Sequence, residues 1–155
     1  MQIRPATEAD SELLFGLILE LASYEKLSEQ VAGDPEVLRR SLFAEGAAEA
    51  LIVEDGGEAI GYAIFFTSFS TFECRSGIWL EDVYVRPDRR RAGIGREVIE
   101  HLAALALERG HVRLEWCALD WNDPALRFYE KLGAKKLDEW KMFRLEREGM
   151  RHLVH

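Results

Sequence analysis

Leu80 to Arg96 read Leu-Glu-Asp-Val-Tyr-Val-Arg-Pro-Asp-Arg-Arg-Arg-Ala-Gly-Ile-Gly-Arg, which is a strand-like run, an arginine-rich turn and the start of a helix. Gly93 and Gly95 let the backbone approach a ligand closely and adopt conformations that other residues resist. Backbone amides at the start of a helix supply unpaired donors and a positive dipole end. The order of strand, glycine turn and helix therefore predicts a cradle for an anion such as a pyrophosphate.

The segment after the turn predicts a long helix that Gly110 ends, and the run before it predicts a strand that ends at Pro87. The helix is expected because its apolar residues recur on one face at helical spacing. These residues are Ile94, Val98, Leu102, Leu105 and Ala106.

The glycine spacing separates this turn from two better-known phosphate loops. Gly93-x-Gly95 is followed neither by the Gly-Lys-Ser/Thr of an NTPase loop nor by the third glycine of a dinucleotide fingerprint. Since a lone Gly-x-Gly is otherwise an ordinary helix-entry turn, the arginines carry the functional argument. They concentrate positive charge in a chain whose formal net charge is −8, and a small ligand with several phosphates would explain the contrast. These arginines are Arg86, Arg89, Arg90, Arg91 and Arg96.

Length and composition indicate one globular domain over residues 1–155. A chain of 155 residues with 48% hydrophobic content can bury its own core, and no composition break marks a second domain. The acidic excess disfavours nucleic acid as the main partner, because affinity for a polyanion comes largely from neutralising its phosphates. A cationic substrate is the more natural partner, since a negative surface attracts it.

The sequence also bears on compartment and on metal chemistry. The N-terminal residues lack the apolar stretch of a signal peptide, and no run approaches the roughly eighteen residues that span a bilayer. We therefore expect a cytoplasmic protein with no membrane partner. Cys74 and Cys117 form no Cys-x-x-Cys pair, and no histidine has a partner at ligand spacing, so we expect reduced thiols and no metal.

Start and turn signals punctuate the chain. Thr7 with Asp10 resembles a capping box that opens a helix ending near Tyr24, and Asp34-Pro35 opens a second helix. Asp55-Gly56-Gly57 favours a tight hairpin turn between two strand-like runs.

The whole pattern predicts an α/β domain with a mixed sheet, in the order β-α-α-β-β-β-α-β-α-β. A further helix is expected to run from Asn122-Asp123-Pro124 through Leu132, with Gly133 as its stop. The expected strands cover residues 3–6, 50–54, 59–69, 78–86, 113–119 and 136–145.

These residues together resemble the GNAT-type N-acetyltransferases, and within them the diamine (spermidine/spermine) and thialysine acetyltransferase group. Arg90-x-x-Gly93-x-Gly95 matches the family's Arg/Gln-x-x-Gly-x-Gly/Ala acetyl-CoA motif, and the order of elements is the family's. The sequence departs from the pattern at Arg91, where these enzymes usually carry glycine, and around 138–140, where the segment is shorter. The likeness to the subgroup spans nearly the full chain and rests on Ile3-Arg4-Pro5-Ala6-Thr7 with Asp10, Leu21-Ala22-x-Tyr24-Glu25, Leu80-Glu81-Asp82 and Trp121-Asn122-x-Pro124-x-x-x-Phe128-Tyr129.

The resemblance implies a GNAT-type mixed, mostly antiparallel sheet flanked by helices, acetyl-CoA as co-substrate, and a homodimer. Tyr129 matches the tyrosine that protonates the departing sulfur of coenzyme A, and Glu81 matches the carboxylate that receives the amine or relays its proton. The implied cofactor-binding residues are Val83, Tyr84 and Val85 beside the pantetheine arm, Arg90, Arg91, Ala92, Gly93, Ile94, Gly95 and Arg96 at the pyrophosphate, and Asn122, Asp123, Pro124 and Ala125 on the other side of the arm. The implied substrate-binding residues are Tyr24, Glu25, Glu81, Trp116, Cys117 and Trp140.

The implied reaction is direct transfer of acetyl from acetyl-CoA to a primary amine of a small cationic metabolite, such as a diamine or polyamine. Neither cysteine has an adjacent histidine, so no acyl-enzyme is expected. Two alternatives stay open: an acceptor that is an amino-acid side-chain amine (thialysine or lysine) or a protein amine, and a domain that binds acetyl-CoA without turnover. Without the resemblance, Phe128-Tyr129 would indicate core packing, and Glu81 with Asp82 would indicate solvated charges at a strand end.

Overall fold

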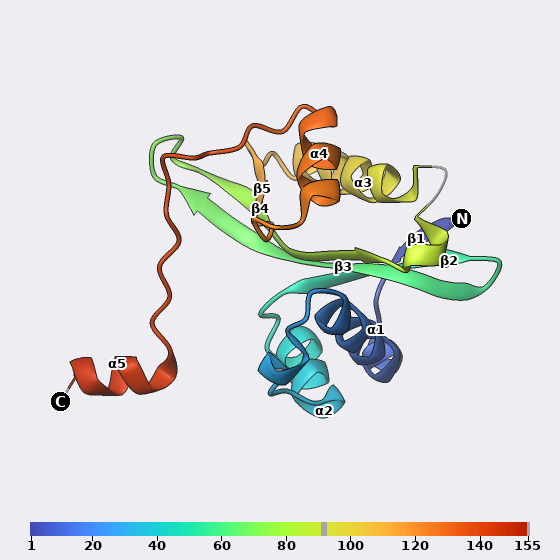
Figure 1. Ribbon diagram of the computed structural model, residues 1–155, viewed down its shortest axis with the longest axis horizontal. Helices are drawn as coiled ribbons and strands as arrows, with labels where there is room; N and C mark the ends of the chain where they lie inside the picture. Colours follow the sequence, from blue (N-terminus) through green and yellow to red (C-terminus); the bar gives the residue numbers. More distant parts are fainter. Residues whose placement is uncertain (91–92, 155) are drawn as a thin grey trace. The chain divides into compact units, whose positions relative to one another are not determined.

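The computed structural model describes residues 1–90 and 93–154, and it contains a five-stranded sheet in the order β1-β2-β3-β4-β5 (Figure 1). The first four strands pair antiparallel, and β5 pairs parallel with β4. The mixed, mostly antiparallel sheet confirms the predicted fold class. The strands are β1 (Gln2–Pro5), β2 (Glu49–Asp55), β3 (Glu58–Ser70), β4 (Arg75–Val85) and β5 (Leu114–Trp116).

The chain divides into two compact units, Met1–Cys117 and Ala118–His155. In the first unit, α1 and α2 lie on one face of the sheet and α3 on the other (Figure 1). Among the described residues, no helix is both long and apolar enough to cross a bilayer. The helices of the first unit are η1 (Glu8–Asp10), α1 (Ser11–Tyr24), η2 (Ser28–Gln30), α2 (Pro35–Arg39), η3 (Arg40–Ala44), η4 (Pro87–Arg89) and α3 (Ile94–Glu108), and those of the second are α4 (Asp123–Lys131) and α5 (Arg147–Leu153).

Several predicted local signals are confirmed. Gly56 and Gly57 adopt φ of 60° and 84° between β2 and β3, as the two central residues of a tight hairpin turn require. Asp34 caps α2, because its Oδ1 accepts a hydrogen bond from the Val37 amide at 2.8 Å. Helix α1 ends at Tyr24, as expected.

The predicted capping box is present at Thr7, although it opens the short η1 turn rather than α1 itself. Asp10 Oδ2 accepts hydrogen bonds from both the amide and the hydroxyl of Thr7, at 2.7 and 2.9 Å. Arg4 donates to both carboxylate oxygens of Asp10, at 2.8 and 2.9 Å, and its Nε donates to Glu54. This network ties β1 to the start of α1 and to β2.

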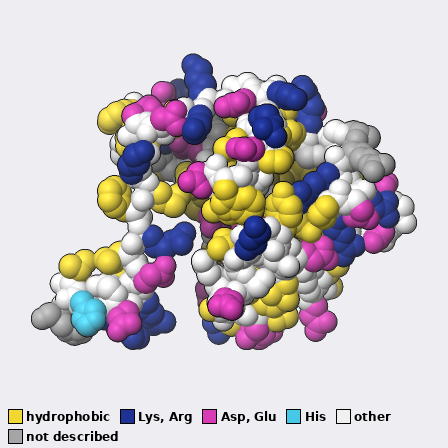
Figure 2. All heavy atoms as spheres, viewed as in Figure 1, with side chains coloured by type: hydrophobic (Ala, Val, Ile, Leu, Met, Phe, Trp, Pro, Cys, Tyr) yellow, Lys and Arg dark blue, Asp and Glu magenta, His cyan; other side chains and the backbone are white. Residues whose placement is uncertain are grey.

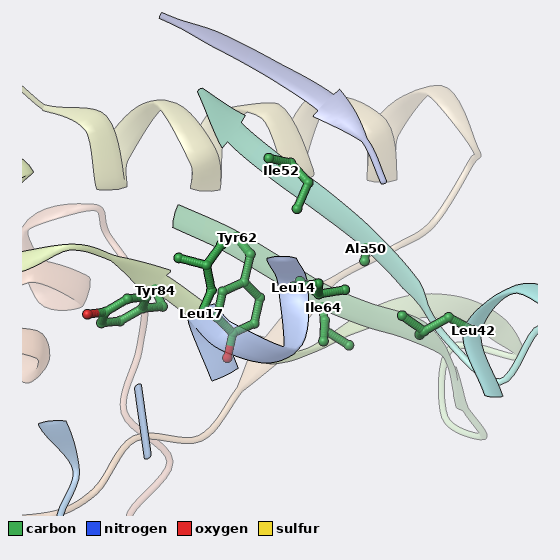
Figure 3. Packing of buried hydrophobic residues seen from close by; sticks show 8 residues of the cluster. All are labelled: Leu14, Leu17, Leu42, Ala50, Ile52, Tyr62, Ile64 and Tyr84. Atoms are coloured by element: carbon green, nitrogen blue, oxygen red, sulfur yellow. The ribbon is translucent and has the colours of Figure 1, made fainter. Parts of the chain in front are cut away.

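The core beside α1 lies on β2, β3 and β4 (Figure 3). Leu14 and Leu17 of α1 and Tyr62 of β3 are almost completely buried, because the apolar face of the helix covers the sheet. Tyr62 lies beside Tyr84, with ring centroids 6.2 Å apart, at the end of the cluster opposite Leu42 (Figure 3). The two tyrosines thus bring polar hydroxyl groups to the edge of an otherwise apolar core.

The predicted last strand, residues 136–145, is wrong. No strand forms over these residues, and their apolar side chains are exposed, with Trp140 at 69% and Phe143 at 92%. Leu137, Trp140 and Phe143 recur every third residue, and such spacing does not put them on one face of a strand. The strand expected over residues 113–119 forms only at Leu114–Trp116.

Candidate active site

A β-bulge at Glu81 sets the geometry of the candidate site. Ile64 of β3 pairs with Asp82, and the next residue, Phe65, pairs with Leu80, so Glu81 is the extra residue on β4. A bulge interrupts the alternation of side chains and redirects them. Glu81 is exposed and accepts a hydrogen bond from the Trp79 indole at 3.1 Å, whereas Asp82 is half-buried.

Asp82 is the most perturbed carboxyl of this region. The Tyr62 hydroxyl donates to its Oδ2 at 3.3 Å, and Tyr62 itself is completely buried. Burial, followed by the negative charges of Glu81 and Glu25, raises the pKa of Asp82 to about 6, although the Tyr62 hydrogen bond acts in the opposite direction. The sequence pattern singled out Glu81 at this position, and the structure adds Asp82 and Tyr62.

Glu25 lies just after α1 and is also partly buried, which raises the pKa of its carboxyl. Its charge acts on both Asp82 and Tyr62. The charges of Glu25 and Glu81, two predicted residues that lie far apart in the sequence, therefore both act on Asp82. Among residues 1–90 and 93–154, no cation forms an ion pair with Asp82, Glu81 or Glu25, and such an arrangement would suit an ammonium group. Over residues 1–90 and 93–154, no cluster of three or more His, Cys, Asp or Glu side chains is arranged to hold a metal.

Arg90 joins the end of α1 to the turn after β4. Its Nε donates to the Val85 carbonyl at 2.8 Å, and its guanidinium lies 4.2 Å from the Tyr24 ring centroid and 5.7 Å from that of Tyr84. These contacts fix Arg90 through both a hydrogen bond and cation–π attraction. Within the described part of the chain, Arg90 has no carboxylate partner, so its charge remains available for an anion.

The other described arginines of the turn are already neutralised, contrary to the expected concentration of free positive charge. Basic and acidic side chains are intermixed on the surface that faces the viewer in Figure 2. The side chains of these arginines are therefore already paired with carboxylates, unlike that of Arg90 among the described residues. The pairs are Arg86 with Glu20 at 2.8 Å and Glu58 at 2.9 Å, Arg89 with Glu58 at 2.9 Å, and Arg96 with Glu100 at 2.7 Å.

The start of α3 has the geometry that the glycine turn predicts. Gly93 has a φ of 84°, which is the left-handed conformation, and its carbonyl accepts the Glu97 amide at 3.0 Å. A Cβ atom at Gly93 would meet nothing within 4 Å, so glycine is needed for its backbone angle rather than for space. The amides of Ile94, Gly95 and Arg96 follow in the first turn, where donors are free for an anion. The predicted contacts of Arg91 and Ala92 lie outside the described residues.

Among the described residues, the edge of β4 that faces β5 has no strand partner over the second half of the strand, although the Val85 carbonyl there accepts Arg90 Nε. Pairing with β5 covers only Ile78–Leu80, and within the described residues Val83–Val85 pair on the β3 side alone. An extended ligand with amide groups can bond to such an edge as a further strand would. This is the edge where the predicted pantetheine-binding residues lie.

Two other predicted substrate residues lie at the C-terminal end of β5. Trp116 is the last residue of β5 and is partly buried. Cys117 comes next and is exposed, which corrects its expected place inside an apolar strand. Although the residue is exposed, neighbouring protein atoms partly desolvate its thiol, and this desolvation, followed by the charges of Glu81 and Glu115, raises the pKa of Cys117 and disfavours the thiolate.

The second unit holds the remaining predicted residues. Asn122 is buried and caps α4, because its Oδ1 accepts the Ala125 amide at 3.4 Å, and Pro124 stands in the first turn. Tyr129 is half-buried on α4 and packs against Phe128, with ring centroids 5.3 Å apart. Asp123 is exposed at the start of this helix, and Trp140 is exposed in the segment without a strand.

Residues 18–134 match the acetyltransferase (GNAT) family model, and the chain belongs to this family. It is 41% identical to thialysine N-epsilon-acetyltransferase of Bos taurus over 99% of this chain and 97% of that protein. A Homo sapiens spermidine/spermine N(1)-acetyltransferase-like protein 1 is 25% identical over 96% of this chain and 23% of its own length. The fold matches an integron cassette protein from V. cholerae with a TM-score of 0.83, at 24% identity over 99% of this chain and 96% of the other. The protein is thus an N-acetyltransferase, which leaves the reading of a cofactor-binding domain without turnover unsupported.

Proposed function

We propose that this enzyme transfers acetyl from acetyl-CoA to a primary amine of a small cationic metabolite. The observation that carries the proposal is the group of carboxylates around Asp82, which lies where β4 loses its β5 partner. Uncompensated negative charge in a partly buried position favours a cationic ligand. The open edge of β4 and the free amides of α3 support a coenzyme A site next to it.

Among cationic amines, we propose the side-chain amine of thialysine or a lysine-like amino acid as the preferred acceptor. The support is the 41% identity to a protein named thialysine N-epsilon-acetyltransferase, compared with 25% identity to the spermidine/spermine acetyltransferase-like protein. A diamine or polyamine remains the second candidate, because Glu25 and Glu81 would both be available to its two charged ends. A protein amine is a third acceptor for the same chemistry.

The chemistry requires a neutral amine, since only the neutral nitrogen can attack a thioester. An ammonium like that of lysine has a pKa of about 10.4, so deprotonation at pH 7 costs about 4.6 kcal/mol. Carboxylates that hold the ammonium and accept its proton reduce this barrier, and positioned acid–base groups typically contribute about 10²–10⁴-fold. In this proposal Glu81 contacts the incoming ammonium, together with Tyr24, Glu25 and Trp116.

The cofactor roles follow the family resemblance. The amides that begin α3, with Arg90, would hold the diphosphate, and the β4 edge at Val83–Val85 would bind the pantetheine arm. By the same resemblance, Asn122 to Ala125 would also contact the arm. Tyr129 would protonate the departing sulfur, and direct attack by the amine needs no acyl-enzyme.

A thiol-release assay tests the proposal. Purified protein with acetyl-CoA is offered thialysine, lysine, putrescine, spermidine and a lysine-containing peptide, and free coenzyme A is measured. We expect the highest kcat/KM with thialysine. Release with the polyamines alone would transfer the assignment to the second candidate, and no release with any amine would overturn the proposal.

Tyr129→Phe tests the proposed acid. Loss of the hydroxyl should lower kcat by about 10²–10⁴-fold while acetyl-CoA binding, measured by calorimetry, changes little. Unchanged turnover would remove Tyr129 from the mechanism. Phe128→Leu is the matched control, because it alters packing on the same helix and removes no acid.

We further propose a homodimer in the cytoplasm that has no nucleic-acid or membrane partner. The dimer is supported by the resemblance to the subgroup, whose members commonly pair, and the missing nucleic-acid partner by the net charge of −8. Light scattering that gives the mass of one chain would overturn the dimer.

A further inference from the structure

Two adjacent carboxylates on β4 differ in surroundings and therefore in the chemistry they can perform. Glu81 is exposed and accepts the Trp79 indole N–H. Asp82 is half-buried, and its Oδ2 accepts the Tyr62 hydroxyl at 3.3 Å. Within residues 1–90 and 93–154, Asp82 has no cationic partner, and its Oδ1 accepts no hydrogen bond.

Tyr62 is fixed by the core, which in turn fixes the carboxylate that it contacts. Its ring is completely buried and packs in one cluster with Leu14 and Leu17 of α1 and with Tyr84 of β4 (Figure 3). A buried ring has little rotational freedom, so the position of the hydroxyl is set by the fold. One oxygen of Asp82 is thereby held by the protein, and the other is left for a ligand.

We propose that Asp82, rather than Glu81, accepts the proton from the acceptor ammonium, and that Tyr62 is the positioning residue that orients Asp82 and sets its proton affinity. The inference rests on the proposed function and divides its acceptor site into two roles. Exposed Glu81, with Glu25, attracts and holds the cation, while Asp82 takes the proton.

The proton balance of the reaction is complete with these groups. The ammonium loses one proton to Asp82, and the neutral nitrogen forms a C–N bond with the thioester carbonyl carbon. The C–S bond then breaks, the nitrogen loses its second proton, and the departing sulfur takes up one proton to become a thiol. Asp82 passes its proton to water, so one ammonium and one thioester yield an amide, a thiol and one proton.

The electrostatics of the site agree with this division. Burial and the charges of Glu81 and Glu25 raise the pKa of Asp82 from 3.8 to about 6. Such a carboxylate binds a proton roughly 100-fold more tightly than an ordinary aspartate, yet it is still ionised at neutral pH. Other charged or titratable groups in this region of the described chain include Tyr62, Tyr84 with Glu20, Arg90 over Tyr84, and Cys117 near Glu81.

The test is the pH profile of kcat/KM for the acceptor in wild type, Asp82→Asn, Glu81→Gln and Tyr62→Phe. Wild type should lose activity below about pH 6, because the base must be ionised. Asp82→Asn should lower kcat by about 10²–10⁴-fold and abolish this acid limb.

The other two variants should move the limb in opposite directions. Tyr62→Phe removes a hydrogen bond to the ionised carboxylate, so the limb should shift upward by roughly half a unit to one unit. Glu81→Gln removes a neighbouring negative charge, so the limb should shift downward while the KM for the acceptor rises. A merely structural role for Tyr62 would change stability without moving the limb.

Ser76→Ala is the matched control. Ser76 lies on β4, the strand that carries Asp82, and its hydroxyl forms a hydrogen bond with Nδ1 of His111 at 2.7 Å. The substitution therefore removes a side-chain hydrogen bond, as Tyr62→Phe does, but one that does not involve Asp82, Glu81 or Tyr62. Its acid limb should coincide with that of wild type. If Tyr62→Phe does not fold, an NMR titration of the Asp82 carboxyl in wild type and Glu81→Gln still tests the role of Asp82 directly, as a pKa near 6 that falls in the variant.

The outcomes separate this inference from the proposed function. Suppose that wild type turns over, and that the acid limb survives in Asp82→Asn and disappears in Glu81→Gln. This result would overturn the role of Asp82 and leave the acetyltransfer proposal intact. An Asp82 that titrates at an ordinary aspartate pKa overturns it as well. Absence of thiol release with every amine overturns both.

Discussion

Asp10 and Asp82 are both withdrawn from bulk water, but their surroundings have opposite sign. Asp10 receives two hydrogen bonds from Arg4 and two from Thr7, and the Arg4 guanidinium holds the pKa of its carboxyl well below the usual range. Within the described part of the chain, Asp82 receives one hydrogen bond, from neutral Tyr62, and its other neighbours include carboxylates. The charge of Asp10, which joins structural elements, is thus neutralised within the protein. The charge of Asp82 is not, and in the proposed site a cationic ligand would supply the missing positive charge.

The largest expected effect on stability is at Asp10. Asp10→Asn removes the ion pair with Arg4 and weakens the cap at Thr7, so it should lower the free energy of unfolding by about 3 kcal/mol at pH 7. Urea denaturation measures the change. Asp88→Asn, at an exposed carboxylate 3.6 Å from Arg89, is the control and should have little effect. Equal losses in both variants would contradict the structural importance of the Asp10 network.

The same contrast predicts an opposite pH dependence for the two carboxyls. The lowered pKa of Asp10 gives stability that is present at neutral pH and is lost as the pH falls below the ordinary range of aspartate. The raised pKa of Asp82 makes wild type lose stability as the pH rises from about 4 through 6.

Asp82→Asn should therefore stabilise the protein, even as it lowers activity. The gain should be about 1–2 kcal/mol larger at pH 8 than at pH 5, since only at the higher pH is the wild-type carboxyl fully ionised in the folded state. Urea midpoints at the two pH values measure this difference. A gain that is equal at both, or larger at pH 5, would show that Asp82 is not destabilised by its ionisation.

The smallest expected effect is on salt dependence. If uncompensated carboxylates attract the acceptor, raising the salt from 50 to 500 mM should increase the KM for a doubly charged amine roughly 2- to 5-fold. A monoamine in the same assay is the control, because it carries one charge and should respond less. Equal responses would indicate that long-range attraction contributes nothing to binding.

The parts of the fold that depend on local sequence signals were predictable. Asp34-Pro35, the Gly56-Gly57 turn and the glycine before α3 each specify a backbone geometry within a few residues, and all three form. The segment 136–145 was not predictable in this way, because a strand needs a partner edge that no local pattern supplies.

The candidate site shows the same limit. Glu25 and Glu81 could be picked out from family-like motifs, but nothing in those motifs reveals the bulge that separates the environment of Glu81 from that of Asp82. Tyr62 carried one usable signal, since a tyrosine within an apolar strand needs a partner for its hydroxyl. The identity of that partner depends on strand register, which only the structure provides.

The Trp79 indole that donates to Glu81 gives the protein a built-in optical reporter. Indole emission responds to the field of a nearby carboxylate, so a cation that settles on Glu81 should shift the fluorescence of Trp79 without any reaction taking place. Subtracting the spectrum of Trp79→Phe isolates this signal from the other tryptophans. Acceptors could then be ranked by spectroscopic titration in the absence of acetyl-CoA, which separates recognition of the amine from its turnover.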